Sequence, residues 1–108
     1  MIVNVCPAGV AHADPDRVWS VIANPARFGE WLDVTLVGEA PAGPVIPGQV
    51  YRFETRELGR SWPVTIEVKG VDPARRWIDL RVVLPLGIVN DEHVTLTRTD
   101  EGTLVRFN

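Results

Sequence analysis

The stretch DPDRVWSVIANPARFGEW, residues 14–31, decides the fold of this protein because it contains two helix start signals in succession. Asp14 can accept hydrogen bonds from the free amides at a helix start, and Pro15 loses no hydrogen bond at the first helical position. Asp16 follows at a place where the helix dipole favours negative charge. The Asn-Pro pair that begins at Asn24 repeats the signal, so the stretch predicts two short helices.

The first of these helices can be only about ten residues long, which is too short for stability in water without tertiary contacts. We therefore expect apolar side chains to hold both helices against the rest of the fold. The predicted anchors are Val18, Trp19, Val21 and Ile22 in the first helix and Phe28, Trp31 and Leu32 in the second.

Strand signals lie on both sides of the helices. Residues 2–13 have β-type composition, but Pro7 and Gly9 interrupt it, which indicates an edge strand or a bulge. Residues 33–39 predict a second strand, and the prolines and glycines of residues 40–48 exclude regular structure there. Period-two alternation then predicts five further strands, at residues 50–57, 62–69, 76–84, 88–98 and 103–108.

The five later strands are joined by short segments rich in turn residues, so the simplest connection is an antiparallel meander. In each strand the alternation places apolar side chains on one face and polar side chains on the other. The sheet is thus predicted to have one concave apolar wall. Its members are Tyr51, Phe53 and Thr55, then Trp62, Val64, Ile66 and Val68, then Ile78, Leu80, Val82 and Leu84, and finally Val105 and Phe107.

The composition predicts one globular domain without a role in nucleic-acid binding or membrane insertion. The chain has 108 residues, 45% of them hydrophobic and 23% charged, which suits a single core. A net charge of −3 with scattered basic residues lacks the basic surface that phosphate backbones require, and no segment is long and apolar enough to insert into a membrane. The single cysteine, Cys6, cannot form an internal disulfide, so we expect a cytoplasmic protein. Cys6 is interpreted as a small apolar strand residue rather than a reactive thiol.

Five segments carry a resemblance to a known superfamily by their order along the chain. They are DPDRVWSVIANPARFGEW at 14–31, GQVYRFE at 48–54, VDPARRW at 71–77, LPLGIVNDEH at 84–93 and DEGTLVRFN at 100–108. Together they resemble the SRPBCC superfamily of START-like domains, which includes polyketide cyclase/dehydrase proteins and the birch pollen allergen. The resemblance implies an α+β helix-grip fold, with an antiparallel sheet of about seven strands and two short helices between strands one and two. It also implies a hydrophobic cavity that carries or transforms lipids, polyketides, hormones or other apolar molecules.

Domains of this superfamily usually continue into a long C-terminal helix that closes the cavity, whereas the present sequence ends at Asn108. We therefore expect a single START-like domain over residues 1–108, truncated before that helix. Roughly ten large apolar side chains of the wall would then lose their cover, each contributing about 1.5–3 kcal/mol when buried. A second copy, a different protein or a bound apolar ligand could cover them, and we predict a homodimer that buries the open face.

Two polar residues are predicted to face the apolar wall. Parity along residues 88–98 places Asn90 and Glu92 on the same side as Val94 and Leu96. Burying an unpaired carboxylate is costly, so an inward Glu92 is a candidate for hydrogen bonding to a ligand or for proton transfer. The alternative interpretation is a bulge near Asn90, or a strand end that emerges into water.

The remaining polar residues form no recognisable site. His93 has outward parity, and His12, at a strand end beside the first helix, is interpreted as a surface or capping residue. The single cysteine and the two histidines are isolated from one another, so we predict no metal site, and no cofactor is indicated. The loop at residues 40–48 is a candidate for a mobile cavity mouth with Val45 and Ile46 as its apolar lip, the alternative being a plain surface connector.

These observations lead to one main hypothesis and two alternatives. We expect a START-like protein that binds an apolar small molecule of lipid, polyketide or aromatic type. The enzymatic alternative is a polyketide aromatase/cyclase or dehydratase in which Glu92 or Tyr51 moves protons. The second alternative is a protein-interaction module that uses the open sheet face and whose cavity is filled by side chains. The predicted ligand-binding residues, which could equally be filled core, are Trp19, Phe28, Tyr51, Phe53, Trp62, Ile66, Leu80, Val82, Asn90 and Glu92.

Overall fold

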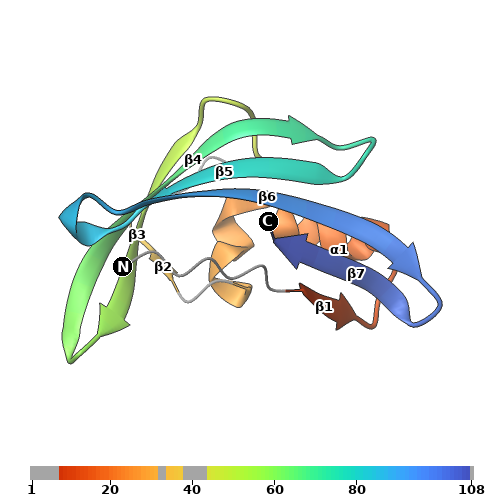
Figure 1. Cartoon of the computed structure of the whole chain (residues 1–108), viewed down its shortest axis with the longest axis horizontal. Coiled ribbons are helices and arrows are strands. Elements are labelled where there is room, and N and C mark those ends of the chain that lie inside the picture. Colours follow the sequence, from red (N-terminus) through yellow and green to blue (C-terminus); the bar gives the residue numbers. More distant parts are fainter. Residues whose placement is uncertain (1–7, 32–33, 38–43, 108) are drawn as a thin grey trace.

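The computed structural model describes residues 8–31, 34–37 and 44–107, and its main feature is a seven-stranded antiparallel sheet. In chain order the elements are β1 (Ala8–Ala11), α1 (Pro15–Ile22), the 3-10 helix η1 (Pro25–Glu30), β2 (Thr35–Leu36), β3 (Val50–Glu57), β4 (Arg60–Asp72), β5 (Trp77–Val83), the short 3-10 turn η2 (Pro85–Gly87), β6 (Val89–Thr99) and β7 (Gly102–Phe107). The strands lie in the order β1-β7-β6-β5-β4-β3-β2 (Figure 1). This arrangement confirms the predicted α+β helix-grip fold and the antiparallel meander from β3 to β7.

Some strand boundaries differ from the prediction. Strand β1 begins at Ala8, the first described residue, and Cys6 lies outside the described residues. The strand pairs with β7 and forms one edge of the sheet, as predicted for the first strand. Strand β2 is two residues long, and part of the longer strand predicted there also lies outside them. Strand β4 begins at Arg60, two residues earlier than predicted, because Leu58 and Gly59 have φ angles of 53° and 72°. Two successive positive φ angles allow a two-residue hairpin, so pairing continues to the end of β3.

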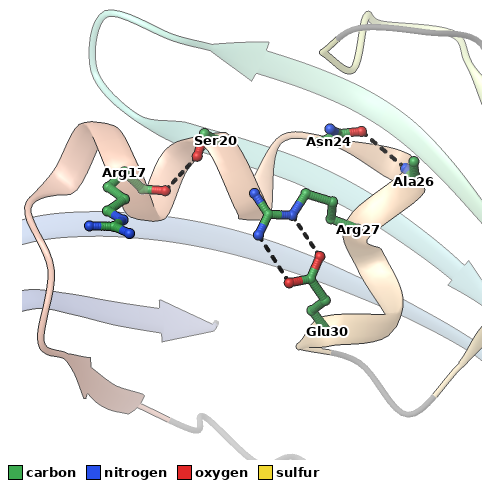
Figure 2. A network of polar contacts seen from close by, with 6 residues as sticks. All are labelled: Arg17, Ser20, Asn24, Ala26, Arg27 and Glu30. Carbon is green, nitrogen blue, oxygen red and sulfur yellow. Dashed lines mark hydrogen bonds and ion pairs between the residues drawn. The ribbon is translucent and has the colours of Figure 1, made fainter.

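The two predicted helix caps are present. The Asp14 carboxylate accepts a hydrogen bond from the backbone N–H of Arg17 at 3.1 Å. The side-chain oxygen of Asn24 accepts one from the amide two residues later, also at 3.1 Å, and starts a 3-10 helix (Figure 2). On the exposed side of η1 the Arg27 guanidinium donates to both carboxylate oxygens of Glu30, at 2.6 and 3.0 Å. Among the described residues, no helix has the length and hydropathy that a membrane crossing requires.

The concave side of the sheet is filled by side chains from α1 and η1, which lie inside its curve (Figure 1). Phe28 of η1 is fully buried, and its ring stacks on Phe53 with 5.8 Å between ring centroids. Its edge contacts reach Trp31 at 5.3 Å and Tyr51 at 6.3 Å. The members of the apolar wall that are buried in the single chain are Tyr51, Phe53, Val64, Ile66, Val68, Ile78 and Leu80.

The expectation of an uncovered wall in a single chain is therefore wrong. The sheet curls far enough for α1 and η1 to cover most of its concave side, and the ring of Phe28 occupies the space between helix and strands. The seven buried side chains lie away from water within one chain, whereas Trp62, Val82, Leu84, Val105 and Phe107 are half-buried. The main physical reason for expecting a homodimer across this face is therefore reduced, and the homodimer stays a prediction.

Of the two residues predicted to form an exposed apolar lip in the loop before β3, only one is exposed. Ile46 is 55% exposed, but Val45 is 4% exposed and belongs to the core. The backbone N–H of Val45 donates to the carbonyl oxygen of Ala23 at 2.8 Å, which joins this part of the loop to the end of α1. The prediction that Val45 forms part of an exposed lip is therefore wrong, and residues 38–43 of the loop lie outside the described residues.

Candidate functional site

An apolar cleft of about 460 Å³ lies between α1 and the sheet edge formed by β1 and β7. A Cβ atom placed on Gly9 would meet no other atom within 4 Å, so the cleft has open space over β1. Arg17 is the charged residue among those that line the cleft. The lining residues are Gly9, Val10, Ala11, Ala13, Arg17, Val18, Val21, Ile22, Trp31, Val105 and Phe107.

The cleft arises where two apolar stripes meet a strand of small residues. Val18, Val21 and Ile22 have the i, i+3, i+4 spacing that forms one face of α1. Val105 lies opposite Gly9 in the β1–β7 ladder, where the missing side chain leaves room above the strand. Sequence reasoning did not identify this cleft, because no local pattern shows that the first and last strands are neighbours. The small residues that alternate along the first strand are the signal that could have indicated it.

Two polar atoms on the concave side of the sheet are buried without a hydrogen-bond partner among the described residues, Trp31 Nε1 and Glu92 Oε2. The Trp31 ring stacks on Phe107 with 5.6 Å between centroids, and both residues line the cleft. Glu92 lies directly opposite the buried Leu80 on β5, so its side chain has the inward direction that parity predicted. Burial raises the pKa of the Glu92 carboxyl, because water that would solvate the charged form is excluded.

Two further polar candidates share one row of the concave wall. Tyr51, Ile66, Val82 and Asn90 are successive partners across β3, β4, β5 and β6. The Tyr51 hydroxyl donates to the side-chain oxygen of Gln49, and burial raises the pKa of Tyr51. Tyr51 is thus a neutral hydrogen-bonding group at the β3 end of this row, and Asn90 lies half-buried at the β6 end.

The ten residues predicted to bind a ligand lie on the concave side at two depths. The structure buries Phe28, Tyr51, Phe53, Ile66 and Leu80 in the core. It leaves Trp19, Trp62, Val82, Asn90 and Glu92 half-buried. None of the ten is among the residues that line the 460 Å³ cleft. The burial of Phe53 and Leu80 agrees with the filled core that the interaction-module alternative expects for this part of the wall, and the ligand-binding role of the ten residues stays a prediction.

The histidines occupy the positions expected of outward residues. His93 projects from the outer side of β6, where its Nδ1 contacts the Asp79 carboxylate and its ring lies 5.6 Å from that of Trp77. His12 is exposed, with Nδ1 3.3 Å from the carbonyl oxygen of Glu101. Among the described residues, no group of three or more His, Cys, Asp and Glu side chains is arranged to hold a metal ion.

Comparison with known proteins identifies the family. The sequence profile of the family described as "Polyketide cyclase / dehydrase and lipid transport" matches residues 9–108. The chain belongs to this family. The match covers every described element from β1 to β7 except the first residue of β1, and it agrees with the SRPBCC resemblance seen in the sequence. Among proteins with curated descriptions, a sequence search finds no match.

Several solved structures share the fold of this chain. A protein from Rhodobacter sphaeroides superposes with a TM-score of 0.70 and is 20% identical, over 93% of this chain and 67% of that one. DynU16, from the dynemicin biosynthetic locus, gives 0.68 at 24% identity, over 95% of this chain but only 35% of DynU16. Ara h 8.0201 gives 0.66 at 15% identity, over 95% of this chain and 72% of that one. At these identities the similarity establishes the fold alone.

Proposed function

We propose that this protein binds a hydrophobic small molecule of lipid, polyketide or aromatic type in the cleft between α1 and the β1–β7 edge. The observation that carries the proposal is the apolar cleft of about 460 Å³ with open space above Gly9. Ligand pockets typically enclose roughly 300–1,000 Å³, with mostly apolar walls and a few polar groups. The description of the family, which includes lipid transport, supports the same class of ligand.

The polar groups of the concave wall would orient such a ligand. Trp31 and Phe107 belong both to the cleft and to the packed region around Phe28, so they link the cleft to the side of the wall that carries Glu92. In this proposal the half-buried residues of the predicted set, Asn90 and Glu92 among them, extend the binding surface beyond the cleft.

Filling the cleft tests the proposal. Gly9→Leu places a side chain in the open space without a steric conflict at Cβ, and it should weaken binding of the probe 1-anilinonaphthalene-8-sulfonate at least about tenfold. Ala8→Leu places the same leucine side chain on β1 at an exposed residue that is not part of the cleft lining, so it should leave the dissociation constant unchanged. Fluorescence titration measures both constants, and circular dichroism confirms folding. Equal probe affinity in the two variants would contradict the proposal.

A second candidate function is catalysis of cyclisation or dehydration in a polyketide substrate. The buried, unpaired oxygen of Glu92 and its raised pKa favour this candidate, because a general acid or base works best with a pKa near the working pH. With a poly-β-keto thioester as substrate, Glu92→Gln should lower kcat at least about a hundredfold and change KM little. The outward Asp91→Asn is the matched control, and an effect on KM alone would argue against a catalytic role.

A further inference from the structure

One buried donor and one buried acceptor on the concave side have no partner among the described residues. They are the indole Nε1 of Trp31 and the Oε2 oxygen of Glu92. A buried polar atom without a hydrogen bond costs free energy, so most such atoms in folded proteins have partners. The Trp62 indole follows that rule, since its Nε1 donates to the carbonyl oxygen of Glu57 at 3.1 Å. The two unpaired atoms therefore indicate a partner that the described residues do not supply.

The strand register brings both residues next to Phe107. Phe107 lies opposite Val94 in the β6–β7 ladder, and the Trp31 ring stacks on Phe107 from the concave side. Glu92 is the next inward residue along β6 from Val94, which makes it the diagonal neighbour of Phe107 on the same face. Long side chains reach one another across such diagonal positions. Trp31 and Phe107 line the cleft, whereas Glu92 lies outside its lining, next to Phe107 on the same face of the sheet.

The chemistry of the two atoms specifies their partner. An indole N–H can only donate, and a carboxylate oxygen can only accept. We propose that a ligand extending from this cleft past Phe107 carries a hydroxyl group on an apolar aromatic or alicyclic body, and that this hydroxyl accepts from Trp31 Nε1 and donates to Glu92 Oε2. The inference rests on the proposed binding function and adds the class of ligand, a phenol or an alcohol.

Other polar ends fit these two atoms less well. A hydrocarbon leaves both unpaired, a methyl ether accepts from Trp31 but cannot donate to Glu92, and a carboxylate brings a second negative charge beside Glu92. Leu80 lies opposite Glu92 on β5, and Asn90 and Val94 flank Glu92 on the same face of β6. A neutral hydroxyl therefore suits the site better than an anion.

The test compares three naphthalenes that differ only in the polar end. Equilibrium dialysis gives the dissociation constants of 2-naphthol, 2-methoxynaphthalene and naphthalene for the unchanged protein. We expect 2-naphthol to bind at least about tenfold more tightly than the other two, since a hydrogen bond to a charged group has about that effect. Trp31→Phe keeps the ring stack and removes the N–H, and Glu92→Leu removes the acceptor. Each should reduce the preference for 2-naphthol to less than about threefold while naphthalene binding is maintained.

Two control variants separate this effect from general damage. Trp77→Phe removes the indole N–H of a ring that lies beside His93 on the outer face, and Asp91→Asn removes a carboxylate on the outer face of β6 that pairs with Arg81. Both should keep the full preference for 2-naphthol. If 2-naphthol and 2-methoxynaphthalene bind equally to the unchanged protein, or if neither test variant reduces the preference, the hydroxyl inference is wrong. If the hydroxyl inference is wrong but Gly9→Leu abolishes binding of all three compounds, the proposed binding function stands. If the unchanged protein binds none of the three compounds, the proposed binding function is refuted.

Discussion

Replacing Phe28 by alanine tests whether the space between η1 and the sheet is packed core. Phe28 is fully buried, stacks on Phe53 and makes edge contacts with Trp31 and Tyr51. Removing a buried phenylalanine ring costs about 3–5 kcal/mol, and each lost aromatic pair adds roughly 0.5–1.5 kcal/mol beyond buried area. We therefore expect Phe28→Ala to lower the free energy of unfolding by at least about 4 kcal/mol, a large part of the 5–15 kcal/mol typical of a domain.

Urea unfolding followed by circular dichroism and tryptophan fluorescence measures this change. A loss of this size also lowers Tm by roughly 15 °C in a domain of this length. The control is Val50→Ala, because Val50 is 57% exposed on β3 and its truncation should change stability by less than about 0.5 kcal/mol. A loss below about 1 kcal/mol for Phe28→Ala would show that the ring borders an open cavity instead of filling the core.

Three further changes test other parts of the structure. Glu92→Leu should raise the free energy of unfolding at pH 7 by about 1 kcal/mol, because it removes an unpaired buried carboxylate. Since the folded state raises the pKa of Glu92, the folded protein holds this proton more tightly than the unfolded chain, and the gain should shrink when urea unfolding is repeated near about pH 4. Asp14→Ala should cost about 1 kcal/mol by removing a helix cap, whereas Asp14→Asn should cost little; equal losses in thermal unfolding would exclude a capping role. Gly102→Ala should destabilise by at least about 2 kcal/mol, because its Cβ would lie 2.1 Å from the carbonyl oxygen of Ala11, while Gly59→Ala, with nothing within 4 Å, should cost clearly less in the same assay.

Local signals in the sequence predicted the elements and the faces of the strands. The caps at Asp14 and Asn24 lie where the side-chain chemistry placed them. Alternation assigned Tyr51 and Phe53 to the buried face of β3, and it gave Glu92 the inward direction that its pairing with Leu80 shows. These features depend on residues close together in the chain, so short patterns are sufficient to indicate them.

Such short patterns could not predict the curvature of the sheet or which elements lie next to its two edges. The expected bare wall is covered, because Phe28 reaches across to β3, and Val45 is buried through its bond to the end of α1. The cleft was missed because it needs Gly9 beside Val105, two residues at opposite ends of the chain. The depth at which a wall residue lies depends on how strongly the strands coil, and alternation carries no information about coiling.

The sequence by itself determined that two short capped helices precede a meander with one apolar face, and its motifs indicated the family. Only the tertiary structure decided which apolar residues became core and which line a cleft. The physical reason is that alternation and capping act over a few residues, whereas burial depends on contacts between distant segments. The pairing of β1 with β7 placed the cleft beside the first and last described strands, and the position of η1 under the sheet brought Trp31, with its unpaired indole N–H, into the cleft lining.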